Sequence, residues 1–269
     1  MTLKEISKLV ESNTDSIEAS QALHKKLITK MVTLNVVSLI VLGVALIYVI
    51  QGYPTFTSDS QKILLIILSG FFVLISTVSL YLLNKPNRLS LAKQFKTFKW
   101  VDTIQFFVIS ILIVLHIITF YVFTAQVYQS SMQPTLTEGD RLIVYQFDYE
   151  PKRNDIVVIF MDSDHYLGAD DSHYVKRIVG LPGDTITVNG SNQLLINGEV
   201  VQQLPTSYVE KVVDLIAFLP ENKIQAGLYF VLGDNVANSQ DSRSLGFIRE
   251  EDIKAKVIFR FFPKVGVIE

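Results

Sequence analysis

Ser131 is the first residue of this sequence whose type and setting suit covalent chemistry. It lies in the stretch 128–136, which follows the last long apolar run and precedes a region rich in strand-forming residues. A serine hydroxyl is a weak nucleophile at neutral pH and needs a base within hydrogen-bonding reach. No base lies close to Ser131 in the sequence, and a segment with serine and proline after a helix is also typical of an ordinary turn. The stretch therefore predicts a nucleophile only if a distant residue supplies the base.

Lys176 is the candidate base. It belongs to the run 174–179, which is typical of a β-strand, and alternate side chains of a strand share a face. Lys176 then lies between Tyr174 and Ile178, while Arg177 points to the opposite face. Desolvation by such neighbours lowers the pKa of a lysine amine and lets it act as a general base. The alternative is an edge strand with two solvated cations.

The segment 233–246 is the third part of a possible site. It follows the apolar run 229–232 and is dense in small hydrogen-bonding side chains, as functional loops that leave a rigid strand often are. We expect an ion-pair network of its charged residues with Arg177, and we expect one hydroxyl to orient a lysine amine. The residues in question are Asp234, Asp241 and Arg243 for the network and Ser239 for the amine. The alternative is a long polar turn.

Composition excludes several other kinds of site. The 269 residues carry a formal net charge of -2, which gives no reason to expect a nucleic-acid partner. The chain has no cysteine, so disulfides, cysteine nucleophiles and thiolate metal sites are excluded. The four histidines lack the spacing of a metal-binding motif, and we expect neither a metal nor a cofactor.

A Ser-His-Asp triad is an alternative to the serine–lysine pair. His165 and His173 lie in the same part of the chain as four aspartates, Asp162, Asp164, Asp170 and Asp171. No serine of the chain lies in a nucleophile-elbow sequence such as G-x-S-x-G. The local context therefore disfavours the triad.

Three apolar runs predict a membrane domain over residues 31–126. The mean hydropathy of the chain is +0.34, and the runs 31–50, 63–83 and 103–125 contain no charged residue. Each run is close to the ~20 residues that a helix needs to cross the hydrocarbon core. The stretch 84–100 has no acid and carries Lys85, Arg88, Lys93, Lys96 and Lys99. The positive-inside rule places this loop and the N-terminal tail, residues 1–30, in the cytoplasm, and everything after the third run outside.

Residues 127–269 predict an extracytoplasmic domain built mainly of β-strands. Short runs rich in valine, isoleucine, phenylalanine and tyrosine alternate with turn signals. The expected strands are 141–147, 155–160, 174–179, 185–188, 193–196, 199–201, 229–232 and 257–262. Asn197-Gly198 lies between two of them and is the sequence of a tight hairpin. The expected fold class is three N-terminal transmembrane helices followed by an all-β or mainly β extracytoplasmic catalytic domain.

Five motifs of this sequence resemble, in order, those of bacterial type I signal peptidases, which are membrane-anchored serine–lysine peptidases. They are residues 131–136, 139–141, 153–157, 174–184 and 233–243. The resemblance covers roughly residues 127–262, and five motifs in this order are far more specific than any one of them. It implies a serine–lysine dyad. Ser131 is expected to attack the scissile carbonyl, and neutral Lys176 to accept the serine proton and later help deliver water to the acyl-enzyme.

The resemblance also implies supporting roles. Ser239 matches the residue that hydrogen-bonds the lysine amine, and Asp241 and Arg243 match a structural ion pair near the site. Asp234 belongs to the same motif, and Met132 is expected to shape the cleft beside the nucleophile.

Three features depart from the family pattern. Many relatives have Arg-Asp where this chain has Val236-Ala237, so a local charged pair is missing. Some relatives have a serine two residues before the nucleophile, where it assists the oxyanion, and this chain has Gln129. Either the Gln129 side chain or the backbone N–H of Ser131 is expected to supply that donor. Three spans in place of one or two are the third departure.

The function implied is removal of signal peptides from secreted precursors at the outer face of a bacterial cytoplasmic membrane. The expected partners are signal-peptide-bearing precursors and membrane lipid, with no nucleic acid. One alternative resembles the self-cleaving SOS repressors, but these are soluble, which the three apolar runs oppose. The other alternative is a catalytically silent membrane anchor with a partner-binding β-domain.

Overall fold

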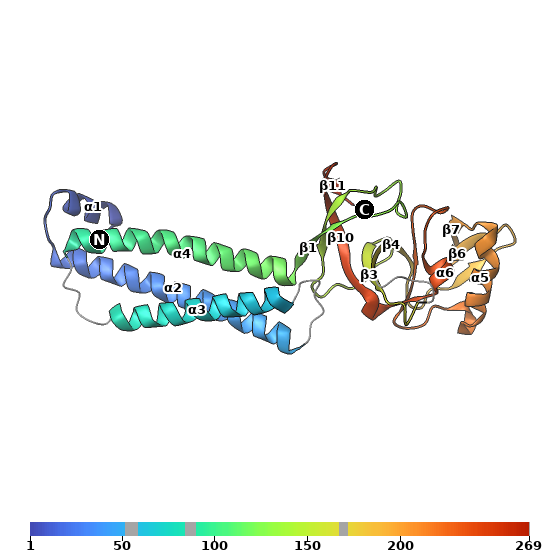
Figure 1. Cartoon of the computed structure of the whole chain (residues 1–269), viewed down its shortest axis with the longest axis horizontal. Coiled ribbons are helices and arrows are strands. Elements are labelled where there is room, and N and C mark those ends of the chain that lie inside the picture. Colours follow the sequence, from blue (N-terminus) through green and yellow to red (C-terminus); the bar gives the residue numbers. More distant parts are fainter. Residues whose placement is uncertain (52–58, 84–89, 167–171, 269) are drawn as a thin grey trace. The chain divides into compact units, whose positions relative to one another are not determined.

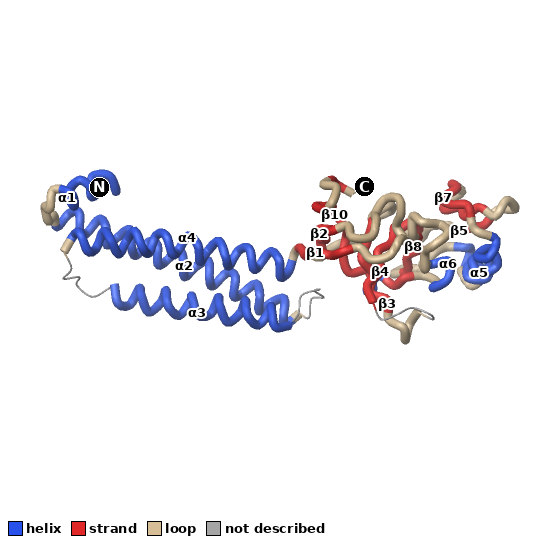
Figure 2. Tube along the Cα trace, turned by 45° about the horizontal axis from the view of Figure 1, so that its top comes forward, coloured by secondary structure: helices blue, strands red, loops and turns tan. Residues whose placement is uncertain are grey.

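The chain divides into two compact units, Met1–Phe120 and Tyr121–Glu269. The computed structural model describes residues 1–51, 59–83, 90–166 and 172–268 (Figure 1). In the described residues, the regular structure of the first unit is helical, and that of the second unit is mainly strands (Figure 2).

The helical unit is organised around its second helix. Its elements are α1 (Leu3–Glu11), α2 (Ile17–Ile50), α3 (Asp59–Leu83) and α4 (Leu91–Phe120). Both α3 and α4 pack chiefly on α2 and touch each other much less. The three long helices are long and apolar enough to cross a membrane, as the sequence predicts. Their leucine, isoleucine and phenylalanine side chains are largely exposed on the outside of the bundle, as lipid-facing positions would be.

Two of these helices begin well before their apolar runs. α2 starts at Ile17 behind the Ser16 cap and includes three lysines of the predicted tail, and α4 starts at Leu91 within the predicted basic loop. Hydropathy marks only the part of a helix that suits hydrocarbon, whereas lysine and glutamine are good helix formers. Lys85 and Arg88 of the predicted loop lie outside the described residues.

The predicted third span, 103–125, is wrong at its outer end. α4 ends at Phe120, and β1 (Val122–Gln126) pairs antiparallel with β2 (Arg141–Tyr145). The second unit accordingly begins at Tyr121, not at the predicted residue 127. An apolar run cannot by itself distinguish the end of a helix from a strand that continues it, so the sequence merged the two.

The main sheet of the second unit is antiparallel. Its order is β1-β2-β10-β3-β4-β8-β9, and β11 also pairs with β10. The bounds not yet given are β3 (Ile156–Met161), β4 (Ser172–Gly180), β8 (Leu228–Leu232), β9 (Ile248–Arg249), β10 (Ile253–Phe262) and β11 (Gly266–Val267). β4 lies between β3 and β8, with Val157 opposite Lys176 and Leu232 opposite Arg177. It is therefore an inner strand, which excludes the edge-strand alternative for Lys176.

A smaller sheet joins β5 (Ile186–Val188), β6 (Gln193–Ile196) and β7 (Glu199–Gln203). Asn197 and Gly198 have positive φ angles between β6 and β7, which confirms the predicted hairpin. α5 (Thr206–Ala217) was not predicted, and it packs Val212 and Ile216 into the same core as the sheet. Mainly antiparallel strands after three long apolar helices confirm the predicted fold class.

Candidate active site

Ser131 lies in the loop between β1 and β2. The loop is anchored on both sides of its serine, because Val127 donates its N–H to the carbonyl of Asp140, and Met132 and Leu136 are almost completely buried. The Ser131 side chain remains partly accessible. Met132 thus fixes the segment from the core, directly beside the nucleophile.

Lys176 reaches Ser131 from the middle of β4. Its Nζ lies 2.9 Å from Ser131 Oγ and donates a second hydrogen bond of 3.1 Å to the carbonyl of Val175. The residue is only 3% exposed. Two residues far apart in the sequence therefore meet at hydrogen-bonding distance, and the lysine amine is shielded from water.

Burial changes the acid–base chemistry of this amine. Desolvation lowers the pKa of Lys176 from 10.5 to about 8, because the protein interior disfavours the charged ammonium form. The negative charge of Asp241 opposes the decrease in pKa, and the positive charge of Arg243 adds to it. A useful fraction of the amine is then neutral near neutral pH, as a general base requires.

Two asparagines hold the backbone of the nucleophile segment. Asn235 donates its backbone N–H to the Ser131 carbonyl at 3.0 Å and its side-chain amide to the Ser130 carbonyl at 3.0 Å. Asn238 donates its side-chain amide to Ser130 Oγ at 2.7 Å. Sequence reasoning missed both residues, although they lie in the loop that it singled out for its hydrogen-bonding side chains. The loop after β8 therefore positions the nucleophile segment.

Gly233 is the point of closest approach between that loop and the nucleophile. A Cβ on Gly233 would lie 2.1 Å from Ser239 Oγ and 2.5 Å from the carbonyl oxygen of Ser131. Such separations are shorter than van der Waals contact, so only glycine fits between the two serines.

Ser239 does not make the bond expected of it. Its hydroxyl is buried and has no hydrogen-bond partner among the described residues, whereas the Lys176 amine bonds Ser131 and Val175. β4 directs the Lys176 amine toward Ser131. Ser239 lies beside Gly233, close to the carbonyl of Ser131. The predicted Ser239–Lys176 hydrogen bond is therefore absent from this structure.

The charged residues form two ion pairs. Arg177 binds Asp234 through two hydrogen bonds of 2.9 Å, which raise the pKa of the guanidinium. Asp241 and Arg243 form a second pair whose side chains are completely buried. The alternation of side chains along β4 places Arg177 and Lys176 on opposite faces of the strand.

The Asp241–Arg243 pair organises the loop that carries it. Asp241 accepts a hydrogen bond of 2.9 Å from the N–H of Gly233, and Arg243 donates one of 2.8 Å to the carbonyl of Val236. Since Val236 takes part through its backbone, the loop keeps this bond without the charged pair that is missing at residues 236 and 237.

Gln129 has no contact that would make it an oxyanion donor. Its side chain is exposed, it has a φ of 69°, and it makes no hydrogen bond with any described residue. The backbone N–H of Ser131 likewise has no intramolecular acceptor in the described ranges, so it is available to a ligand.

The two histidines of the triad alternative have other contacts. His165 lies 2.9 Å from Asp162 in a local turn, and the ring of His173 packs against Phe160. Asp170 and Asp171 fall outside the residues that the structure describes. The basic group within hydrogen-bonding distance of Ser131 Oγ is the Lys176 amine.

Comparisons with known proteins identify the family of this chain. The family model described as "Signal peptidase, peptidase S26" matches residues 100–262. The chain belongs to the signal peptidase family. Signal peptidase I of Bacillus licheniformis is 37% identical over 190 residues, which cover 67% of this chain and 92% of the relative. Signal peptidase I T of Bacillus subtilis strain 168 is 37% identical, over 62% and 88% of the two chains.

The family membership makes this chain a membrane-anchored signal peptidase hydrolase, and its three long apolar helices make it multi-pass. A crystal structure of a signal peptidase I from Enterococcus faecalis V583 is similar at 25% identity and a TM-score of 0.28, covering 40% of this chain and 97% of that one. The match of the family model includes Ser131, Lys176 and the loop after β8, whereas α2 and α3 precede it.

Gly233→Ala should reduce kcat/KM by about 10²-fold. The added methyl group must displace either the Ser131 carbonyl or Ser239. Misplacing a reacting group by ~1 Å lowers the rate by about this factor. Cleavage of a fluorogenic signal-peptide substrate by the full-length protein measures this. Gly190→Ala is the matched control, because no atom lies within 4 Å of its added methyl group. Equal activity of the two variants would show that the close approach at Gly233 is unimportant.

Lys176→Met should raise the free energy of unfolding by up to about 3 kcal/mol at neutral pH. Burial lowers the pKa of Lys176 from 10.5 to about 8, and this shift destabilises the folded protein by about the same free energy, which the variant regains. The folded-state pKa is depressed, so the unfolded state binds more protons between about pH 8 and 10.5, and the wild type gains stability over that window. The advantage of the variant should therefore shrink as the pH rises from 8 toward 10. Thermal unfolding followed by circular dichroism tests this, with Lys211→Met at an exposed position as control. An advantage that is absent at pH 7, or independent of pH, contradicts the account.

Proposed function

We propose that this chain cleaves N-terminal signal peptides from secreted precursors at the outer face of the cytoplasmic membrane, with Ser131 as nucleophile and Lys176 as general base. The observation that carries the proposal is the distance of 2.9 Å between Ser131 Oγ and the buried Lys176 Nζ. A nucleophile and a base in hydrogen-bonding reach, with the base desolvated, form the minimal unit of covalent acyl transfer.

The reaction proceeds in two halves. In the first, Ser131 Oγ bonds to the scissile carbonyl carbon while its proton passes to the neutral Lys176 amine. The lysine then gives that proton to the leaving amine of the mature protein, and the signal peptide stays on Ser131 as an ester. In the second, Lys176 takes a proton from water, the hydroxide adds to the ester carbonyl, and Ser131 leaves with the proton returned to it.

The oxyanion of each tetrahedral intermediate needs a fixed donor, and a single such donor contributes about 10²–10³-fold in rate. The backbone N–H of Ser131 serves as that donor. Its lack of an acceptor among the described residues supports this role, and the exposed side chain of Gln129 supports it over the glutamine amide. Ser239 and the Asp241–Arg243 pair act by positioning, since none of them hydrogen-bonds the reacting serine hydroxyl.

The topology of the chain supports the site of action. The basic residues that flank α3 and α4 favour a cytoplasmic location for that end of the helices, so the β-rich unit lies outside after three crossings. A precursor held by its own apolar segment presents its cleavage site near the same membrane surface. The substrate class is therefore a membrane-inserted precursor protein, which lies extended beside Ser131 and Lys176.

Ser131→Ala and Lys176→Ala should each lower kcat/KM by at least about 10⁴-fold, because residues that act as one catalytic unit fail together when either is removed. The full-length protein in detergent micelles is incubated with a labelled precursor, and the appearance of the mature product is followed. Ser191→Ala and Lys211→Ala replace exposed residues of the same unit and should cleave at the wild-type rate.

The outcomes separate the alternatives. A folded Lys176→Ala variant that retains full activity would falsify the dyad. A wild-type protein that binds the precursor without cleaving it would favour the silent anchor.

A further inference from the structure

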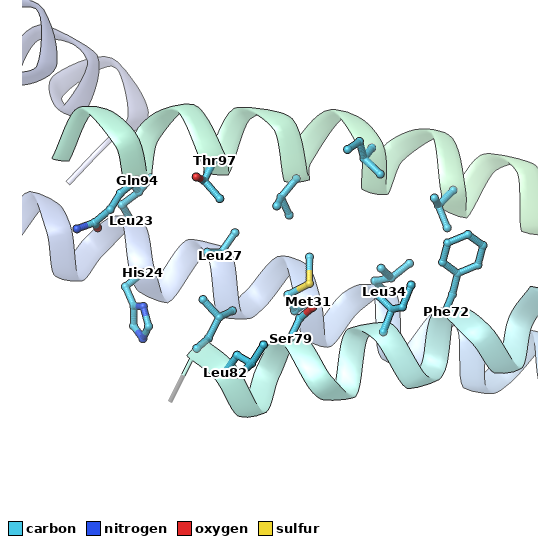
Figure 3. A pocket seen from close by; sticks show the side chains of 15 residues that line it. Leu23, His24, Leu27, Met31, Leu34, Phe72, Ser79, Leu82, Gln94 and Thr97 are labelled. Atoms are coloured by element: carbon cyan, nitrogen blue, oxygen red, sulfur yellow. The ribbon is translucent and has the colours of Figure 1, made fainter. Parts of the chain in front are cut away.

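The helical unit contains a pocket of about 590 Å³ between α3 and α4, with α2 as its floor. Figure 3 shows labelled side chains from all three helices pointing into this space. The volume is within the about 300–1,000 Å³ that is usual for sites of small organic ligands. It exists because α3 and α4 both pack on α2 and only slightly on each other. None of the steps at Ser131 and Lys176 uses this pocket.

The lining changes from polar to apolar along the helices. His24, Gln94 and Thr97 lie at one end, and Leu34 and Phe72 at the other (Figure 3). On α2 the lining runs from Leu23 to Leu34, which is about 16 Å at ~1.5 Å per residue. This length is close to half of the ~30 Å hydrocarbon core of a bilayer. The pocket therefore has the length and the polarity gradient of a single lipid in one leaflet.

The position of the polar end of the pocket indicates which leaflet of the membrane the pocket lies in. His24 and Gln94 precede the uncharged parts of α2 and α4, on the side that the positive-inside rule places in the cytoplasm. The apolar end, with Leu34, Phe72 and Val108, lies within the uncharged runs. The pocket thus extends from the inner membrane surface into the inner leaflet.

Lysines lie near the polar end on both α2 and α4. Lys93 lies one helical turn before Thr97, whose hydroxyl bonds the Lys93 carbonyl, and it is exposed. Lys25 follows His24 directly. These two lysines, together with Lys26 and Lys96, form no ion pair with any described residue, whereas Lys30 is paired with Asp102. Each juxtamembrane lysine attracts an anionic headgroup by ~1 kcal/mol.

We propose that this pocket binds an anionic phospholipid of the inner leaflet, with an acyl chain between α3 and α4 and the phosphate near Lys93 and His24. Charge distinguishes this occupant from the signal peptide of a precursor. A signal peptide inserts with its basic N-terminal region toward the cytoplasm. That region would meet the lysines at the polar end of the pocket and be repelled. The pocket is also only as deep as one leaflet, whereas an inserted peptide helix would extend beyond it.

Native mass spectrometry of the full-length protein in detergent tests the proposal. The protein is titrated with phosphatidylglycerol and, separately, with phosphatidylcholine of the same acyl chains. One phosphatidylglycerol should bind more tightly than any further lipid and more tightly than phosphatidylcholine. Val101→Phe fills the pocket and should abolish that tight site. Val114→Phe, on the lipid-facing side of the same helix α4, should keep it.

A second pair of variants tests the headgroup without changing the packing. Lys93→Gln should weaken phosphatidylglycerol binding about fivefold and leave phosphatidylcholine binding unchanged. Lys4→Gln on α1 should change neither. Cleavage of a soluble peptide substrate is measured in parallel and should stay at the wild-type rate in all four variants, which reports that the β-rich unit is intact. The far-UV circular dichroism of each variant should match that of the wild type, which reports that the helices are folded.

Three results would overturn the proposal. The first is equal affinity for the two lipids in the wild type together with no effect of Lys93→Gln. The second is a tight lipid that survives Val101→Phe as well as it survives Val114→Phe. The third is an apolar signal-peptide segment that displaces phosphatidylglycerol from the wild type and fails to bind Val101→Phe.

Discussion

The burial of one amine is the constraint on which the active site depends. An ammonium group on an inner strand is unfavourable because it loses its hydration, and Lys176 responds with a pKa lowered to about 8. The same desolvation makes the amine available as a base, so the cost to stability and the gain in reactivity have one physical origin. β4 is an inner strand between β3 and β8, and the nucleophile segment lies against the end of the lysine side chain.

A second constraint keeps the nucleophile in place over the amine. The Asp241–Arg243 pair is completely buried, and a buried pair is tolerated when further hydrogen bonds satisfy both partners. Here the N–H of Gly233 and the carbonyl of Val236 supply those bonds. The loop shaped in this way presents Asn235 and Asn238 to the backbone around Ser131. Segments more than a hundred residues apart in the chain are therefore held together by fixed hydrogen bonds.

Local sequence patterns predicted those structural features that depend mainly on neighbouring residues. Uncharged apolar runs predicted the three long helices, Asn197-Gly198 predicted its hairpin, and alternation along 174–179 placed Lys176 and Arg177 on opposite faces. The sequence could not show that α4 ends at Phe120, because Val122 and Phe123 of β1 continue the apolar run and its partner β2 lies further along the chain. α5 was missed although Val209, Val212 and Ile216 have helical spacing, which a search for that period would have found.

Contacts between distant segments were the least predictable part of the site. The roles of Asn235 and Asn238 depend on where the loop after β8 meets Ser130 and Ser131, which no spacing in the sequence reveals. Ser239 was expected to bond the lysine amine because of the resemblance, and in the structure it lies beside Gly233 with no hydrogen-bond partner among the described residues. Family motifs thus located the loop, and only the three-dimensional arrangement showed which of its side chains make the bonds.

The pH dependence of single-turnover cleavage tests the buried base most directly. A base must be neutral to accept the serine proton, so log kcat/KM should rise with pH and level off above a pKa of about 8. Measuring single turnovers with the full-length protein keeps product release out of the profile. A rate that rises with the pKa of an ordinary solvated lysine, near 10.5, or that is flat from pH 7 to pH 10, would contradict a desolvated lysine base.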